Sequence, residues 1–201
     1  TLSGLIISDT LTDGNTASLT LSNLPSTSSS TSSGTTQKGS DIDGEQADDG
    51  SGRVSVNSDG NYVAISAPNN DGNGNNSGHV RVYSWNGSSW VQRGADINGE
   101  AAGDLSGESV AINDSGNLVI IGASNNSGAN GAASGHARVY SWNGSAWTQR
   151  GSDLDGEAAS DGFGDSAAIN SDGNIVAVGS QSNGASNRGH VRVFEWSSNS
   201  W

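Results

Sequence analysis

The chain has 201 residues, and its 21 Asp and Glu against 8 Lys and Arg give a formal net charge of −13 at pH 7. This charge argues against nucleic acid as a partner, because binding a polyanion requires clustered cations, and it favours a cation as ligand. No apolar run approaches the roughly 20 residues of a membrane-spanning helix, so we expect no membrane insertion. Only 31% of the residues are hydrophobic and 30 are glycine, which is typical of an all-β, turn-rich chain.

The composition also predicts a location. Cysteine is absent, and Ser, Thr, Asn and Gly are abundant, which together with the acidic charge favours an extracellular or cell-surface protein. No charged segment followed by an apolar one marks an export signal, so we expect any such signal to have been removed. Sequons that would allow glycosylation in a eukaryotic secretory pathway are at Asn75, Asn86, Asn113, Asn125 and Asn143.

The first 24 residues lie outside the pattern that fills the rest of the chain. SGLIISD and ASLTLSNL alternate apolar and polar residues around TDGN, which predicts an N-terminal arm of two strands at residues 1–24. The Ser/Thr-rich residues 25–37 predict a flexible or O-glycosylated tether. We expect the arm to add a strand to a neighbouring subunit.

From residue 38 the sequence repeats. GHVRVYSWNGSSWVQRG at 78–94 returns as GHARVYSWNGSAWTQRG at 135–151 and, shortened, as GHVRVFEWSSNSW at 189–201. The repeat uses all three histidines, which are 57 and 54 residues apart, and all six tryptophans. A period of about 55 residues is typical of propeller blades and solenoid units. We therefore divide this part into three blades at residues 38–92, 93–149 and 150–201.

Each period contains four segments rich in β-branched or aromatic residues and bounded by Gly, Asn or Ser. In the second copy these predicted strands cover residues 108–113, 118–123, 136–142 and 146–150. The predicted fold is thus all-β, with three tandem four-stranded antiparallel blades of the β-propeller type. We interpret the histidines and tryptophans as packing groups, because a catalytic constellation is expected to break the repeat.

The last two strands of a period are joined by Asn-Gly, which is favoured in two-residue type I′ turns. With this dipeptide at the centre of the turn, Tyr83 would face Trp90. The equivalent pairs would be Tyr140 with Trp147 and Phe194 with Trp201. Cross-strand aromatic pairs of this kind contribute about 0.2–1 kcal/mol each.

The segment DGFGDSAAINSDGNIVAVGS at 161–180 resembles the FG-GAP repeats of integrin-α-type β-propellers and of secreted microbial and algal proteins. Phe163-Gly164 stands at the FG position, and near GAP stand Ser66-Ala67-Pro68, Ile121-Gly122-Ala123 and Val178-Gly179-Ser180. The resemblance covers residues 38–201 and implies a blade fold, an extracellular location and adhesive or structural work. Two departures are that Ser51-Gly52 and Ser106-Gly107 replace FG, and that a short NSDGN turn replaces the family's calcium loop. The resemblance therefore implies no calcium at that turn.

An acidic motif, Asp-x-Asp/Asn-Gly-Glu-x-x-x-Asp, precedes the first strand of each copy. Its members are Asp41, Asp43, Glu45 and Asp49; Asp96, Asn98, Glu100 and Asp104; and Asp153, Asp155, Glu157 and Asp161. Oxygen ligands at alternate positions around a glycine turn are suited to Ca²⁺, although the glycine position differs from that of an EF-hand. The alternative is an acidic crossover in which these side chains only cap turns. Both interpretations stay open at this point.

Three blades cannot close a propeller, which typically takes about 4 to 8. The leading prediction is therefore an extracellular structural or adhesive repeat protein that binds copies of itself, through its N-terminal strands and blade faces, in a filament or surface assembly stabilised by calcium. The alternative is a calcium-assisted lectin-like or protein-binding propeller module, in which loops 69–78, 124–135 and 181–189 bind glycans or surface proteins. A glycan-acting enzyme ranks third, and we expect no enzyme, because every acidic residue with repeated partners has a structural explanation.

Overall fold

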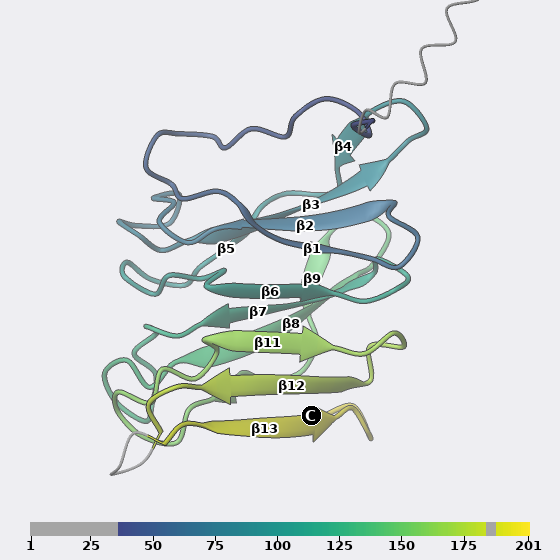
Figure 1. Cartoon of the computed structure of the whole chain (residues 1–201). Helices are drawn as coiled ribbons and strands as arrows, with labels where there is room; N and C mark the ends of the chain where they lie inside the picture. The colour runs from purple at the N-terminus through teal and green to yellow at the C-terminus, as the bar shows by residue number, and fades with distance from the viewer. Residues whose placement is uncertain (1–35, 184–187) are drawn as a thin grey trace, which may run out of the picture. The chain divides into compact units, whose positions relative to one another are not determined.

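The computed structural model describes residues 36–183 and 188–201, which contain strands and turns and no helix (Figure 1). Within these two ranges, thirteen strands form three antiparallel sheets. The strand arm predicted at 1–24 and nearly all of the tether predicted at 25–37 lie outside the described residues. In the part of the chain that is described, no helix is long and apolar enough to cross a membrane.

The strands follow the same order in each sheet. The first sheet contains β1 (Arg53–Val56), β2 (Tyr62–Ala67), β3 (His79–Trp85), β4 (Trp90–Gln92) and β5 (Ile97–Asn98). The second sheet contains β6 (Ser109–Ile112), β7 (Leu118–Ala123), β8 (His136–Trp142), β9 (Trp147–Gln149) and β10 (Leu154–Asp155). The third sheet contains β11 (Ser166–Ile169), β12 (Ile175–Ser180) and β13 (His190–Glu195).

The strands predicted in the second copy agree with β6 to β9 within one residue at each end. Strands β5 and β10 were not predicted; each takes two residues of an acidic crossover and pairs with β3 or β8. In the third sheet the last hairpin is reduced to an isolated bridge between Ser197 and Ser200. Within residues 36–183 and 188–201 the three sheets do not close into a barrel or a propeller, so the propeller part of the prediction stays a prediction.

The turn between the first two strands of each sheet is held by an asparagine at its start. In the second sheet the Asn113 side-chain oxygen accepts the backbone N–H of Asn117 at 3.1 Å and of Leu118 at 2.9 Å. Gly116 has φ +66°, a left-handed conformation that glycine adopts without strain. Asn57 and Asn170 make the equivalent bonds in the other two sheets. The sequence NDSGN therefore fixes where β6 ends and β7 begins.

The predicted register of the β3–β4 hairpin is wrong by two residues, because the turn is centred one residue later than expected. Trp85 pairs with Trp90, and Tyr83 pairs with Gln92. The central residues of the turn are Gly87 and Ser88, and Gly87 has φ +100°, as in a type II′ turn with glycine first. Asn86 precedes these two central residues, and its side-chain oxygen accepts the backbone N–H groups of Ser88 and Ser89.

The same correction applies to the other two hairpins. Trp142 pairs with Trp147 in the second sheet. In the third sheet the rings of Trp196 and Trp201 lie 5.1 Å apart between centroids. That turn centres on Ser198 and Asn199, both with positive φ, which is the type I′ pattern. Each hairpin thus brings two tryptophans together, and the expected Tyr or Phe partner lies two residues earlier in the strand.

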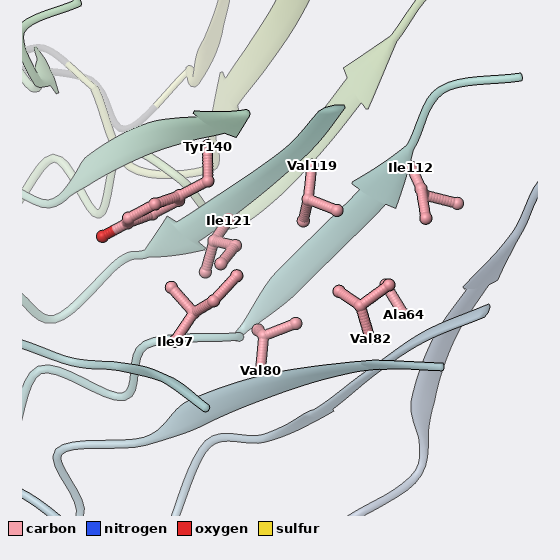
Figure 2. Close-up of a cluster of buried hydrophobic side chains, with 8 residues drawn as sticks. All are labelled: Ala64, Val80, Val82, Ile97, Ile112, Val119, Ile121 and Tyr140. Carbon is pink, nitrogen blue, oxygen red and sulfur yellow. The ribbon is translucent and has the colours of Figure 1, made fainter. Parts of the chain in front are cut away.

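The three sheets stack face on face, and the middle sheet is covered on both sides. Val119 and Ile121 of β7 face the first sheet, where they meet Val80 and Val82 of β3 (Figure 2). The alternate residues Leu118, Ile120 and Val139 face the third sheet and meet Val176 and Val178. Successive residues of a strand point to opposite faces, so a strand buried on both faces reads as a continuous apolar run. This explains why all six residues of β7 are buried.

Each tryptophan pair also clamps the segment that leads into its own sheet. The Arg93 guanidinium lies 4.9 Å from the Trp142 ring centroid, and the Trp147 indole N–H donates to the Arg93 carbonyl at 2.7 Å. A Cβ on Gly94 would lie 2.6 Å from Trp142, so only glycine fits there. The equivalent groups are Lys38 and Gly39 with Trp85 and Trp90, and Arg150 and Gly151 with Trp196 and Trp201. Trp142, Trp147, Trp196 and Trp201 therefore hold the links between successive sheets, and Trp85 and Trp90 hold the segment before the first sheet.

Candidate cation site

Histidine begins the third strand of each sheet, and strand alternation decides what it meets. Val80 and Val82 of β3 face the second sheet, so His79 and Arg81 lie on the opposite face. His79 is 1% exposed. Its equivalent His136 at the start of β8 is 2% exposed. A polar ring buried to this extent requires polar neighbours, because burial removes it from water.

The acidic crossovers supply those neighbours. Antiparallel pairing of β5 with β3 sets Asn98 opposite His79, which brings Asp96 beside the imidazole. The His79 Nδ1 atom lies 3.6 Å from Asp96 Oδ2 and 3.8 Å from Glu45 Oε2. Glu45 comes from the crossover before the first sheet and Asp96 from the crossover after it. One histidine therefore connects two successive crossovers.

The second copy repeats this arrangement. The His136 Nδ1 atom lies 3.5 Å from Asp153 Oδ2 and 3.9 Å from Glu100 Oε2. In each cluster, one ligand-type atom from each of the three residues lies within 4.8 Å of the other two. These two are the only groups of three or more His, Cys, Asp or Glu with this spacing among the residues that the structure describes.

Each carboxylate in the two clusters is held through its second oxygen. In the second cluster Glu100 Oε1 accepts from Arg138 at 2.9 Å, and Asp153 Oδ1 accepts from Gln149 at 2.6 Å. In the first cluster Arg81 lies 3.5 Å from Glu45 Oε1, and Gln92 donates to Asp96 Oδ1 at 2.6 Å. The oxygen that remains on each carboxylate is the one that faces the histidine.

The third copy has only half of this arrangement. The His190 Nδ1 atom lies 4.0 Å from Glu157 Oε2, and its Nε2 atom is buried without a hydrogen-bond partner. Its ring packs edge-on against Phe163 at 5.7 Å between centroids. No second carboxylate joins His190 among the described residues.

The last carboxylate of each acidic motif is buried and accepts hydrogen bonds from other groups. Asp104 is buried, and its Oδ2 atom accepts from the Ala101 N–H at 2.9 Å and from the Asn126 amide at 3.0 Å. Asp49 and Asp161 are also buried and accept from asparagine side chains. These bonds all go to one oxygen, Oδ2, of each carboxylate.

The third residue of each motif contributes its backbone and not its side chain. The carbonyl groups of Asp43, Asn98 and Asp155 accept from Arg81, Arg138 and Arg192, respectively. The first carboxylate, Asp41, accepts from Gln37 as its two equivalents accept from Gln92 and Gln149. The structure thus does not gather the four side chains of one motif, and it groups Glu of one motif with Asp of the next. Calcium at the predicted quartets stays a prediction.

The buried histidines are neutral at neutral pH. Burial lowers the pKa of His79 below its usual value of 6.5, and the nearby charges of Asp96 and Glu45 oppose this only in part. Burial also lowers the pKa of His136, and the adjacent Arg138 lowers it further. A neutral imidazole offers a free nitrogen lone pair, which is the form that binds a metal ion.

Comparison with known proteins adds no family assignment. A scan against protein-family models finds no match, and a search of the curated proteins finds no similar sequence. The resemblance to FG-GAP repeats therefore stays a prediction that depends on the motifs within the chain.

Proposed function

We propose that this protein is an extracellular structural or adhesive module that binds copies of itself, head to tail, through the two outer faces of its sheet stack. The observation that carries the proposal is that apolar residues exposed on these end faces are equivalent to residues that are buried between sheets inside the chain.

One end face belongs to the third sheet. Val191 and Val193 of β13 are each 67% exposed, and Ile175 of β12 is 40% exposed. The residues equivalent to the two valines in β8, Ala137 and Val139, are buried by the next sheet. The outer face of the third sheet thus has the apolar pattern of an inner face.

The other end face belongs to the first sheet. Val54 and Val56 of β1 are 63% and 61% exposed. Their equivalents in β6 pack against the preceding sheet: Val110 is partly buried and Ile112 fully buried in the cluster between the first two sheets. A third-sheet face placed on a first-sheet face would repeat the contact between the first two sheets. Such a head-to-tail contact that does not close produces a filament.

A short strand pairing supports the same junction. Ile97 and Leu154 are each 5% exposed in β5 and β10, where they pair with Val80 and Ala137. The equivalent residue of the first crossover, Ile42, is in no strand and is only partly buried. In a second copy it would pair with Val191, because β13 carries no partner at that edge among the described residues. Adding a strand to a free sheet edge is a common mode of association.

The expected strength of the contact is modest. Burying the exposed parts of the five aliphatic side chains on the two faces contributes roughly 5–10 kcal/mol. Association costs about 4–15 kcal/mol in lost freedom of motion. Assembly should therefore depend on protein concentration and on the strand pairing of Ile42.

Sedimentation velocity over a concentration series tests the proposal. The wild-type chain should form species larger than a monomer as its concentration rises, and the double variant V191E/V193E should remain monomeric. The control is V91E, because Val91 is also exposed but lies on β4, away from both end faces. A monomeric wild type at its highest soluble concentration, or association that V191E/V193E leaves unchanged, would contradict the proposal.

A second candidate, glycan binding by a lectin-like module, is supported by an open groove of ≈ 790 Å³. Its lining includes Trp142, Trp196, Arg150 and Asp172. Aromatic faces beside polar side chains are suited to sugar rings. Between the first two sheets Tyr62 occupies the position that Leu118 takes at this groove, and Arg93 lies 4.8 Å from its ring. L118Y should therefore fill the groove and abolish any quenching of tryptophan fluorescence by an oligosaccharide.

A further inference from the structure

The geometry points to two binding sites for a divalent transition-metal ion of the zinc class, one at Glu45, His79 and Asp96 and one at Glu100, His136 and Asp153. Each site would use one imidazole nitrogen and two carboxylate oxygens. This inference goes beyond the proposed function and does not rest on self-association.

The first support is the distance between the candidate ligand atoms. The carboxylate oxygens lie 3.5–3.9 Å from Nδ1 of His79 or His136, beyond the range of a normal hydrogen bond. Two ligands that bind one ion at about 2.0–2.2 Å with tetrahedral geometry lie roughly 3.3–3.6 Å apart. The Asp distances already fall in or next to this interval. Glu45 and Glu100, with side chains 40% and 46% exposed, have room to move closer.

The second support is that hydrogen bonds to the outer oxygens of the carboxylates fix their orientation. Gln92 holds the outer oxygen of Asp96, and Gln149 holds the outer oxygen of Asp153. Arg138 holds the outer oxygen of Glu100. Outer-shell donors of this kind fix the direction of a ligand and are typical of metal sites. They also leave one free oxygen per carboxylate, and that oxygen faces the imidazole.

The third support is the buried histidine itself. Among the residues that the structure describes, neither His79 nor His136 has a carboxylate within normal hydrogen-bond distance of its Nδ1 atom, although its side chain is 98% buried in each case. Two carboxylates and one guanidinium surround each ring, which leaves a local charge of about −1 for a cation to neutralise. A bound ion would give Nδ1 a partner closer than any carboxylate among the described residues.

The donor set favours a transition metal over calcium. Ca²⁺ takes 6 to 8 oxygen ligands, whereas each cluster offers two carboxylates and an imidazole. Asp49 and Asp104 lie outside the two clusters and accept other hydrogen bonds. Zn²⁺ accepts mixed nitrogen and oxygen ligands and is stable with three protein ligands and a water. The chain has no cysteine and only three histidines, so competing sites for Zn²⁺ are few.

Calorimetric titration of the untagged chain with ZnCl₂ tests the inference. Wild type should bind two equivalents, and the double variant D96N/D153N should bind none. The introduced asparagines keep a side-chain oxygen that can still accept the hydrogen bonds of Gln92 and Gln149. H190N is the matched control, because His190 has a single carboxylate neighbour, and it should still bind two equivalents. The pair Q92A/Q149A should keep two sites and lower the affinity about 10–100-fold. Circular dichroism confirms that each variant is folded.

A titration with CaCl₂ and one with CoCl₂ separate the remaining outcomes. Co²⁺ bound in these sites should give visible d–d absorption that ZnCl₂ removes and CaCl₂ does not. The inference is overturned if wild type takes up no Zn²⁺, if folded D96N/D153N binds as many ions as wild type, or if Ca²⁺ displaces Co²⁺ at equal concentration.

Discussion

The close contact of Gly94 with Trp142 predicts that even a change to alanine at this position destabilises the protein strongly. In G94A the new Cβ would lie 2.6 Å from Trp142, inside the closest approach of two carbon atoms. Gly94 also has φ +81°, where a side chain costs about 1–2 kcal/mol. Overpacking against a fixed ring adds about 1–3 kcal/mol. We therefore expect G94A to lower the free energy of unfolding by roughly 2–5 kcal/mol.

The control is G144A. Gly144 has a similar φ of +104°, but nothing lies within 4 Å of its added Cβ. Urea unfolding followed by tryptophan fluorescence and circular dichroism would give both values, and G144A should show only the backbone cost of about 1–2 kcal/mol. If G94A loses no more stability than G144A, Trp142 and Trp147 do not clamp this segment, and their proposed role in holding the link between the first two sheets fails.

Three further predictions concern a buried phenol, a turn and the groove. Burial raises the pKa of Tyr140 above 10, so the folded state keeps a proton that the unfolded state releases, and stability falls as pH rises through about 10. In Y140F the residue matches Phe194, its equivalent in the third repeat. Urea unfolding should show that Y140F loses less stability than the wild type between about pH 9 and about pH 11, and equal losses would contradict this. N113A removes the side-chain oxygen that accepts two backbone N–H groups in its turn, so thermal unfolding should show a loss of about 1–3 kcal/mol in stability. N143A, in an exposed hairpin, should lose less. L118Y should abolish oligosaccharide quenching while leaving sedimentation unchanged; retained quenching would exclude the groove as the glycan site.

The sequence predicted the long strands well, because their signal is local. Leu118–Ala123 and His136–Trp142 combine β-branched residues with clear turn residues at both ends, and the structure confirms both bounds. The hairpin register failed because Asn-Gly-Ser contains two candidate turns. Glycine serves in the first position of a type II′ turn as well as in the second of a type I′ turn, so the dipeptide alone did not decide between them.

The candidate site was only half predictable. The spacing within each acidic motif identified Glu45 and Asp96 as candidate ligands, but it placed them in separate motifs, whereas the structure brings both to His79. The contact of Asp96 with His79 depends on β5, a two-residue strand that has no periodic pattern and forms only because β3 offers it an edge. Such a pairing is decided by the tertiary fold, although the exact recurrence of His with Asp 17 residues later was a visible signal.

The most direct test of the stacked-sheet account is a disulfide between two copies. The chain has no cysteine, so I42C/V191C introduces one pair at the predicted junction. The account predicts that mild oxidation converts this variant into a ladder of covalent oligomers on a non-reducing gel, because each copy offers one residue at each end. The same treatment of I42C/V91C should give at most sparse cross-links. Equal patterns for the two variants would contradict head-to-tail stacking.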